Sequence, residues 1–473
     1  MIVPSLHPGP ASAACESRRR WSFGLTPRTI GLLLVGFVWL VPGFWDARLA
    51  YAMPAWDLLV LVCALLDGLR LPAPAELTAG RSWSNAPALD SETEIELTLE
   101  NHSRTIVECR LIDDLPPALV PETTTLRLTA FPRVPATLRY RFEPKERGDC
   151  ETGSLYIRYR SPLGLLERWA RAPLLQTVRV YPALRAGEEQ QIFLARSRQI
   201  ELQLRHARQR GLGRDFESLR EYREGDDLRD ICWTATARRG SPITRQYQSE
   251  RSQPIWIVLD CGRLMRSRVA IDKAFQNSGS TPAHRVHSKL DYACTTAVAL
   301  AQLALYSGDR VGLLAYGEGI QQRLLPGRGA AHLRQLIESL AQLRAESGEA
   351  NHLRATATLN RLQPRRSLIL WVTDLAETAM RPEVIDGAAQ LLRRHVLLFV
   401  AMAQPEVEFI AQSRPNNVEE MFRAAAAQEM AARRELLLAR LHEQGALTLD
   451  LNPEALTSSV LNQYLNIKER AMV

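Results

Sequence analysis

The sequence lacks the cysteine spacing of a metal site or of a disulfide framework. Its 473 residues include seven cysteines, an odd number, and no CxxC pair. Zinc sites and small disulfide-rich domains both depend on paired, regularly spaced cysteines. We therefore expect neither, and we expect the large domains to lie in a reducing compartment.

Motifs of the common hydrolases are also missing. There is no Walker loop for nucleotide phosphates and no G-x-S-x-G turn, and His284 and His287 lack the HExxH spacing. A strand that ends in Asp260 also opens phosphatases of the haloacid dehalogenase type, but these need an acid where this chain has Gly262. We predict no enzymatic activity, and we keep a hydrolase with an unrecognised active site as an alternative.

Aromatic residues are scarce, at 7% of the chain, and basic charge is not concentrated in one segment. The net charge of +7 comes from arginines that are spread along the sequence and mixed with acids. Nucleic-acid interfaces gather basic residues on one face, so we predict no nucleic-acid partner, whereas anionic membrane lipid fits a basic surface. The length, with 46% hydrophobic and 23% charged residues, predicts several modules.

Two apolar runs near the N-terminus predict a helical hairpin in a membrane. Residues 1–28 are polar and indicate an unstructured cytoplasmic tail. Residues 30–45 and 53–69 are apolar, and each run is slightly shorter than the roughly 20 residues of a perpendicular membrane helix. We predict a transmembrane hairpin over residues 29–70. A secretory signal is the alternative, disfavoured because bulky aromatic residues stand where a small-residue cleavage site would be.

The placement of arginines predicts the topology of this hairpin. Arginines flank both outer ends, within residues 18–28 and 70–81, whereas the turn between the runs contains only Arg48. The positive-inside rule then places both termini in the cytoplasm. We expect a multi-pass protein of the inner (cell) membrane with its large C-terminal region in the cytoplasm. The opposite topology would suit an extracytoplasmic adhesion or envelope-binding protein, which is a second alternative.

Residues 75–185 predict a β-sandwich. Prolines, glycines and polar turns separate short alternating segments at residues 94–99, 106–112, 125–128, 136–142, 153–159 and 177–181. This pattern is typical of an immunoglobulin-like sandwich. Because the module contains no catalytic motif, we interpret it as a spacer or a docking surface.

Residues 186–253 contain a linker followed by a dense run of paired charges. An amphipathic helix with Leu228, Ile231 and Ala235 on one face is predicted to begin after Asp226 and to end before Gly240. The next apolar run ends at Asp260, as expected of a central parallel strand that presents a carboxylate at its C-terminal edge.

These residues carry a resemblance to a known family. The string REYREGDDLRDICWTATARRG, followed by ER and by VLDCGRLM, closely resembles the signature of the domain-of-unknown-function 58 family. The resemblance implies a von Willebrand A-like domain preceded by a membrane hairpin and a β-rich domain. It also implies association with a MoxR-type AAA+ ATPase as partner.

Residues 254–473 alternate between apolar strands and amphipathic helices. Such alternation predicts a parallel sheet with helices on both faces, and the order fits a Rossmann-type, von Willebrand A-like domain. The fold class that we predict is therefore multi-domain: a transmembrane helical hairpin, an immunoglobulin-like β-sandwich and an α/β domain.

A degenerate cation site is predicted at the edge of this sheet. In the von Willebrand A pattern DxSxS, Asp260 matches the first position, whereas Gly262 and Leu264 replace both serines. Asp374 matches the distal aspartate of the pattern, and no threonine is assigned. Mg²⁺ prefers hard oxygen ligands, so the loss of two hydroxyls predicts weak binding at best and no resident cofactor.

The signature segment supplies the residues that we assign to an interaction face: Asp226, Asp227, Arg229, Trp233 and Arg238. Tryptophan and arginine are favoured at interface hot spots. The same residues could instead form a buried latch, with Trp233 in the core. We predict a non-catalytic, membrane-anchored adaptor that acts with the ATPase in assembly or maturation of a complex containing a client protein.

Overall fold

The computed structural model describes residues 9–17, 22–43, 51–119, 125–183, 193, 195–196, 215–223, 228–248, 253–271, 285–375 and 383–470. The chain divides into two compact units, Met1–Ala183 and Leu184–Val473. The predicted interaction residues Asp226 and Asp227 lie outside the described residues.

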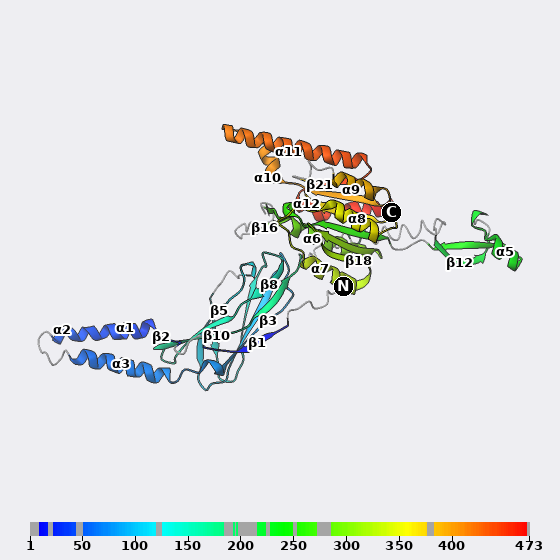
Figure 1. The fold of residues 1–473 in the computed structure, drawn as a ribbon. Helices are drawn as coiled ribbons and strands as arrows, with labels where there is room; N and C mark the ends of the chain where they lie inside the picture. Colours follow the sequence, from blue (N-terminus) through cyan, green and yellow to red (C-terminus); the bar gives the residue numbers. More distant parts are fainter. Residues whose placement is uncertain are drawn as a thin grey trace. The chain divides into compact units, whose positions relative to one another are not determined.

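The first unit combines two antiparallel sheets with a helical hairpin (Figure 1). Its elements are β1 (Ala11–Ala14), β2 (Phe23–Leu25), α1 (Pro27–Gly36), η1 (Phe37–Trp39), α2 (Leu40–Gly43), α3 (Ala52–Gly68), η3 (Pro74–Glu76), β3 (Leu77–Trp83), β4 (Thr93–Asn101), β5 (Val107–Asp113), η4 (Pro117–Leu119), β6 (Leu126–Ala130), β7 (Ala136–Phe142), β8 (Gly148–Thr152), β9 (Leu155–Arg160), β10 (Leu166–Ala172) and β11 (Gln176–Val180).

The two sheets share one apolar core. One sheet has the strand order β1-β3-β4-β7, the other β2-β10-β9-β5-β6, and β11 pairs with β8. Alternate residues of β4 and β9, such as Ile95, Leu97 and Ile157, are buried in the same cluster because successive strand residues point to opposite faces. The predicted two-sheet arrangement is present, whereas its assignment to the immunoglobulin-like type stays a prediction.

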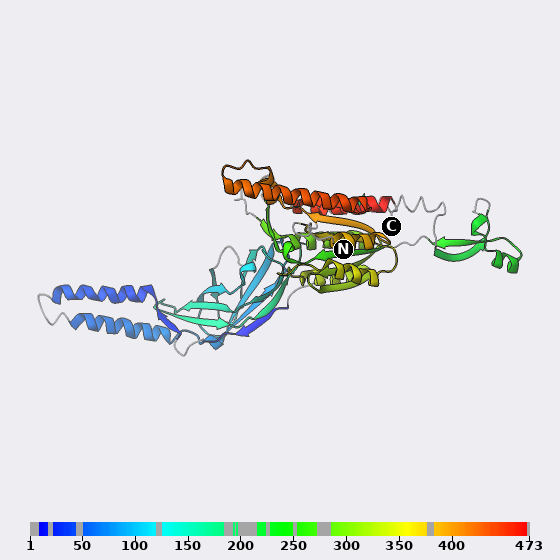
Figure 2. The same cartoon turned by 45° about the horizontal axis from the view of Figure 1, so that its top comes forward.

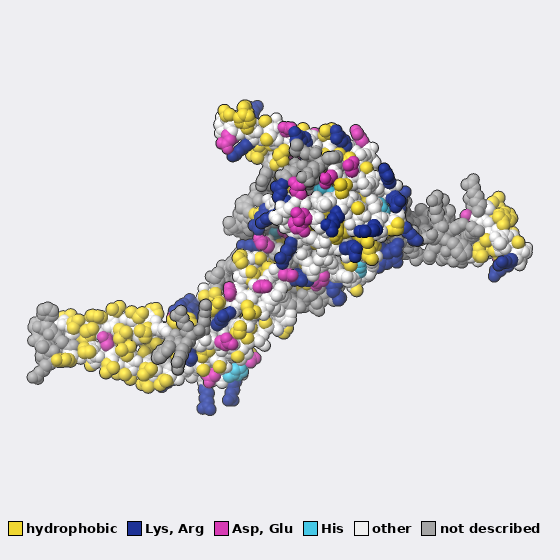
Figure 3. All heavy atoms as spheres, in the orientation of Figure 1, with side chains coloured by type: hydrophobic (Ala, Val, Ile, Leu, Met, Phe, Trp, Pro, Cys, Tyr) yellow, Lys and Arg dark blue, Asp and Glu magenta, His cyan; other side chains and the backbone are white. Residues whose placement is uncertain are grey.

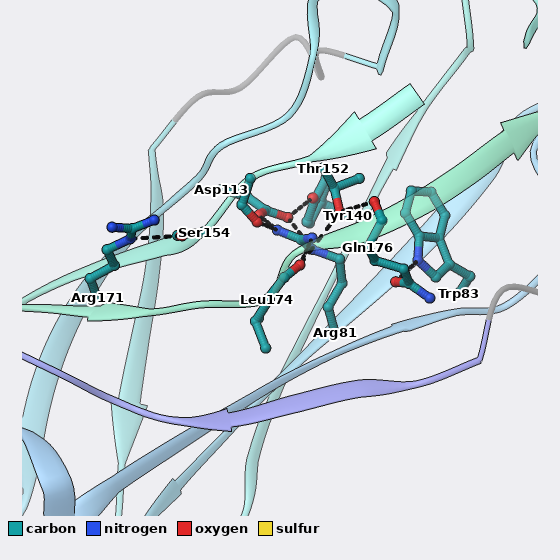
Figure 4. Close-up of polar contacts among 10 residues, drawn as sticks. Arg81, Trp83, Asp113, Tyr140, Thr152, Ser154, Arg171, Leu174 and Gln176 are labelled. Carbon is teal, nitrogen blue, oxygen red and sulfur yellow. Dashed lines mark hydrogen bonds and ion pairs between the residues drawn. The ribbon is translucent and has the colours of Figure 1, made fainter. Parts of the chain in front are cut away.

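A buried ion pair joins the two sheets (Figure 4). Arg81 of β3 donates through Nε to Asp113 Oδ2 of β5 at 3.1 Å, and the hydroxyl of Tyr140 on β7 donates to the same oxygen at 2.6 Å. Arg81 also donates to the carbonyl of Leu174 at 3.0 Å. Burial, together with the Asp113 carboxylate, raises the pKa of Tyr140 well above its usual range. Because removing one partner would leave a buried charge unpaired, this contact fixes how the sheets face each other.

The N-terminal segment is part of the sandwich, so the prediction of an unstructured tail over residues 1–28 was wrong for its described strands. Ala11–Ala14 pairs with β3, and Phe23–Leu25 pairs with β10. Each strand therefore extends one of the two sheets by pairing with open backbone groups at a sheet edge. The sequence around these strands is too short and too polar to show this pairing on its own.

The two apolar runs form a helical hairpin, as predicted. The first run is divided among α1, η1 and α2, and α3 has 17 residues. Among the described residues, none of the helices is both long enough and apolar enough to cross a membrane. That this hairpin, predicted over residues 29–70, crosses a membrane stays a prediction.

A close contact and a hydrogen bond hold the hairpin together. A Cβ at Gly36 would lie 2.5 Å from Asp57 Oδ1, so any larger residue there would require the Asp57 side chain to move. Trp56 Nε1 donates to the carbonyl of Leu32 at 2.9 Å. The paired helices leave large apolar side chains on their outer surface, which Figure 3 shows as a continuous hydrophobic covering.

The loop between β9 and β10 forms hydrogen bonds with both ends of the hairpin. Thr26, the N-cap of α1, donates to the carbonyl of Gly164 at 2.6 Å. Near the end of α3, the buried Asp67 accepts backbone hydrogen bonds from Leu163 at 3.2 Å and Leu165 at 3.3 Å. The hairpin is therefore attached to the sandwich by buried polar contacts at its base.

The second unit contains a mixed six-stranded sheet. Its elements are β12 (Asp215–Glu221), η5 (Leu228–Asp230), α5 (Trp233–Arg239), β13 (Ile243–Gln248), β14 (Pro254–Asp260), η6 (Arg263–Arg266), β15 (Arg268–Ile271), β16 (Arg285–Ser288), α6 (Lys289–Tyr306), β17 (Arg310–Tyr316), β18 (Ile320–Gly327), α7 (Gly329–Ala341), α8 (His352–Leu362), β19 (Leu368–Thr373), α9 (Glu383–Leu392), β20 (Val396–Met402), α10 (Pro405–Gln412), α11 (Val418–Glu443), β21 (Leu447–Leu451) and α12 (Pro453–Glu469).

Helices cover both faces of this sheet (Figures 1 and 2). The strand order is β18-β17-β14-β19-β20-β21, and every pair is parallel except β17 with β18. Helices α8, α9 and α11 pack on one face, where Trp256, Trp371 and Phe399 form the core. The predicted parallel sheet is confirmed, and the antiparallel edge strand β18 is an addition that the sequence pattern did not indicate.

The signature segment forms a two-stranded hairpin with a short helix. Strands β12 and β13 pair antiparallel, and the helix α5 begins only at Trp233. The predicted helix from Asp226 was therefore too long, because the backbone N–H of Cys232 is bonded to the carbonyl of Ile243 at 2.7 Å and not within a helix. The predicted end is correct: Gly240 caps α5 with a positive φ of 73°.

Candidate functional site

The central strand β14 ends in a buried carboxylate, as predicted. Asp260 accepts a hydrogen bond from the backbone N–H of Gly262 at 2.7 Å and another from the hydroxyl of Thr373 at 2.6 Å. Burial raises the pKa of Asp260 to about 6, although both hydrogen bonds act to lower it. The carboxyl group thus titrates close to neutral pH.

The second predicted residue, Asp374, follows the neighbouring strand β19 and forms a buried ion pair. Lys289 Nζ lies 2.5 Å from Asp374 Oδ2, and the two side chains are 2% and 0% exposed. Lys289 is the first residue of α6, where the helix dipole disfavours a cation. The ion pair outweighs this unfavourable position, so an ammonium group of the chain itself neutralises the carboxylate.

Two further groups complete the surroundings of Asp374. Gln404 Nε2 donates to its Oδ2 at 3.0 Å, and Arg434 Nη1 of α11 lies 3.6 Å from its Oδ1. Arg434 also forms two hydrogen bonds with the carboxylate of Asp450 in β21, at 3.1 and 2.6 Å. The carboxyl edges of the parallel strands and the helices α6 and α11 are therefore joined through one charged network.

The serine positions of the cation-binding pattern are closed by the fold. A Cβ at Gly262 would lie 2.8 Å from the backbone nitrogen of Ala350, so a serine there would require the chain to move. Leu264 lies in η6 and offers no side-chain oxygen. Across the part of the chain that the structure describes, no three His, Cys, Asp or Glu side chains are grouped to hold a metal ion. That Asp260 and Asp374 form at best a weak cation site stays a prediction.

Sequence patterns missed three residues of this network. Thr373, Lys289 and Arg434 approach the carboxylates only because separate strands and helices end at the same edge of the sheet. A lysine directly after the N-cap of an apolar helix is one signal that could have identified Lys289. Arg434 stands in a helix rich in arginine and gives no such signal.

The described interaction residues are on the surface. Trp233 is 70% exposed, and Arg238 is also exposed, so neither side chain is a core residue. Arg229 lies in η5, but its side chain is outside the described part. The exposure of Trp233 favours a partner surface over a buried latch.

A single family match spans most of the signature segment and both aspartates of the sheet edge. Residues 218–413 match the family model described as "Protein of unknown function DUF58". We refer to this matching segment as the DUF58 region. The match covers the end of β12, all of β13 and both Asp260 and Asp374, and it confirms the resemblance found in the sequence.

Curated relatives of this chain occur in mycobacteria. Uncharacterized proteins from Mycobacterium tuberculosis (strain ATCC 25618 / H37Rv) and Mycobacterium bovis (strain ATCC BAA-935 / AF2122/97) are each 25% identical over 199 residues. These residues amount to 41% of this chain and 56% of each relative. The chain thus spans about half the length of the curated relatives it matches.

Solved structures similar to this chain include three proteins of low identity. They are the conserved hypothetical protein BatB from Bacteroides thetaiotaomicron (13% identity, 46% of this chain, 100% of that chain, TM-score 0.27), a von Willebrand factor type A protein from Catenulispora acidiphila (11%, 48%, 44%, 0.27) and the SpRpn10 VWA domain (12%, 45%, 95%, 0.25). The description of the sheet rests on its own strand order and register.

The raised pKa of Asp260 predicts a pH dependence of stability. The folded carboxyl holds its proton up to about pH 6, whereas an aspartate in the unfolded chain has a pKa of 3.8. Stability should therefore fall as pH rises from 3.8 to about 6, by at most about 3 kcal/mol from this group. Asp260→Asn should flatten this part of the profile in urea unfolding. Asp386→Asn, at an exposed position of α9, should keep the wild-type slope, and equal slopes in both variants would contradict the assignment.

The closed serine positions predict no tight Mg²⁺ or Mn²⁺ binding by the DUF58 region. Asp374 already has Lys289 as its counter-ion, and neither Gly262 nor Leu264 offers a side-chain oxygen. Calorimetric titration should show no micromolar affinity, and at pH 5 Asp260→Ala should cost about 1–3 kcal/mol of stability, because two donors lose their acceptor. Micromolar Mg²⁺ binding that Asp260→Ala abolishes would show that the site is a functional cation site.

Proposed function

We propose that this chain is a non-catalytic, membrane-anchored adaptor that presents its α/β unit to a MoxR-type AAA+ ATPase during assembly or maturation of a protein complex. The family resemblance supplies the choice of partner. The exposed tryptophan of the signature is the observation that carries the adaptor role.

The surface of α5 has the composition of an interface centre. Trp233 is 70% exposed, and Arg238 and Arg239 follow it in the last turn of the helix. Leu228, just before the helix, is 67% exposed. Interface hot spots are enriched in tryptophan and arginine. Exposing the large apolar indole to water is unfavourable in free energy, and a bound partner would bury it.

The sheet edge supports a binding role without catalysis. Asp260 and Asp374 are both buried and both engaged in hydrogen bonds within the chain. A general base or a nucleophile must reach substrate, whereas these carboxylates contact Thr373 and Lys289. In the proposed adaptor their network holds the unit rigid beneath its recognition surface.

The hairpin supplies the proposed membrane anchor. Its exposed large apolar residues include Ile30, Leu32, Leu34, Val35, Phe37, Val38, Trp39, Leu40, Val41, Leu58, Leu59, Leu61, Val62, Leu65 and Leu66. Contiguous apolar surface of this kind marks a site that contacts lipid or protein. The two ends of a hairpin leave on the same side, in keeping with the arginines at both outer ends. We propose that it is embedded in the inner membrane, with the α/β unit in the cytoplasm.

Lipid attachment through the hairpin can be tested by flotation with vesicles. Leu58→Asp combined with Leu65→Asp should abolish co-flotation of the full chain, since each acid in the apolar layer costs about 3 kcal/mol. Both leucines are 63% exposed, so the fold should tolerate the change. The matched control replaces Leu325 and Leu353, exposed residues of the other unit, with aspartate. Flotation of the hairpin variant at the wild-type level would refute the anchor.

The adaptor role can be tested by recovery of an ATPase from membranes with the tagged protein, with and without ATP. Trp233→Ala with Arg238→Ala should lose the ATPase, because the side chains removed are exposed and the fold is expected to persist. Tyr306→Ala with Arg323→Ala removes a comparable exposed pair from the same unit and should retain it.

The same experiment can reject the adaptor. Equal recovery with both double variants would move the interface away from α5. Failure of the wild type to recover any ATPase, together with hydrolysis by the purified chain alone, would support the hydrolase alternative instead.

A further inference from the structure

Three arginines from neighbouring strands lie directly opposite one another on the five-stranded sheet of the sandwich. Arg110 of β5 is the register partner of Arg127 of β6 and of Arg158 of β9. The residues on either side of Arg110, Cys109 and Leu111, are buried in the core. Because strand residues alternate between faces, the three guanidinium groups leave the sheet on its outer face.

This row of arginines is only partly neutralised. Like charges directly opposite each other destabilise a sheet. Arg158 forms an ion pair with the buried Glu167, whose Oε2 accepts no hydrogen bond in the described structure. Among described residues, the side chains of Arg110 and Arg127 have neither a hydrogen bond nor an ion pair. The guanidinium groups of Arg110 and Arg127 are therefore available to bind an anion, and an anion between them would relieve their repulsion.

A fourth arginine and one more acid complete the cluster. Arg160 is the register partner of Glu108 on one side and of Glu167 on the other. With Arg110, Arg127 and Arg158, four guanidinium groups face two carboxylates, so two positive charges are uncompensated.

The outer face is hollowed at this cluster. A cavity of about 220 Å³ is lined by Glu108, Cys109, Arg110, Arg127, Leu128, Thr129, Arg158 and Arg160. The lining brings guanidinium donors from three strands and the residue Thr129 to one space. Its dimensions and its donors suit a small oxyanion more than an apolar ligand.

We propose that this cavity binds a phosphate group, carried by a phospholipid headgroup or free in solution. Arginine matches phosphate oxygens with two parallel N–H donors, which a lysine cannot do. A phosphate monoester carries about −1.5 to −2 charges at neutral pH, which equals the uncompensated charge of the cluster, whereas a carboxylate would neutralise only half of it. This site belongs to the sandwich and is independent of the adaptor surface on α5.

The site can be tested with the full chain in non-ionic detergent, which contributes no phosphate. Calorimetric titration with inorganic phosphate, in a background of chloride at constant ionic strength, should show binding that the double variant Arg110→Gln, Arg127→Gln weakens at least about tenfold. In phosphate-free buffer the same variant should unfold at a higher temperature than the wild type, because the opposed charges are gone.

Two control variants separate recognition from general charge. Arg139→Gln with Arg141→Gln removes the same charge from β7 of the other sheet, where the side chains are 64% and 62% exposed, and should bind phosphate like the wild type. Arg110→Lys keeps the charge and the fold but lacks the paired donors, so its affinity should fall severalfold.

A second arm distinguishes the two sources of phosphate. If mixed micelles with phosphatidic acid raise the unfolding temperature of the wild type but not of Arg110→Gln, Arg127→Gln, the ligand is a lipid headgroup. If only inorganic phosphate does so, the ligand is a soluble phosphate. The proposal is overturned if neither arm separates the two proteins, if chloride stabilises the wild type equally, or if the β7 control loses as much affinity as the double variant.

Discussion

Burial of carboxylates at the edge of a parallel sheet is the constraint on which the α/β unit depends. An ionised carboxylate away from water is tolerated only when it is paired and hydrogen-bonded. Here Lys289 lies 2.5 Å from Asp374 and supplies the positive charge from within the chain. The pair fixes the start of α6 against the end of β19, and Arg434 extends the same network to α11. The Lys289–Asp374 ion pair thus both positions the two elements and neutralises the buried carboxylate, and it needs no side-chain oxygen at position 262.

The sandwich meets the same constraint with a different pair. Arg81 and Asp113 join its two sheets, and Tyr140 adds a third polar group to the buried contact. Such contacts contribute little net stability compared with apolar packing, but breaking them is costly, so they select one arrangement of the sheets. The outer-face arginines differ because no equivalent set of acids faces them. That contrast, between buried charges that are matched and surface charges that are not, separates the structural groups of the sandwich from its candidate binding groups.

The functions that we propose for this chain depend on surfaces that the fold leaves exposed. An α/β sheet with helices on both faces serves many unrelated activities, so the architecture alone identifies none. Trp233 on α5 and the apolar covering of the hairpin are instead particular to this sequence. The loop that bonds to Thr26 and Asp67 attaches the hairpin to the sandwich.

The sequence alone determined what depends on local periodicity. The apolar run ending at Asp260, the amphipathic pattern of α11 and the glycine that ends α5 each encode an element within a few residues, because burial and backbone conformation there are local properties. The strand pattern indicated Asp260 as a carboxylate at a strand end, and the family resemblance indicated Asp374.

Only the tertiary structure decided which distant residues meet. Strand β1 pairs with β3 across a whole helical hairpin, and the short polar segment that forms it has no periodicity to show this. Lys289 reaches Asp374 because two loops end at one sheet edge, and Arg110 meets Arg127 and Arg158 because of strand register. A shift of one residue in that register would turn each side chain to the opposite face, so charge opposition between strands is a property of pairing and not of composition.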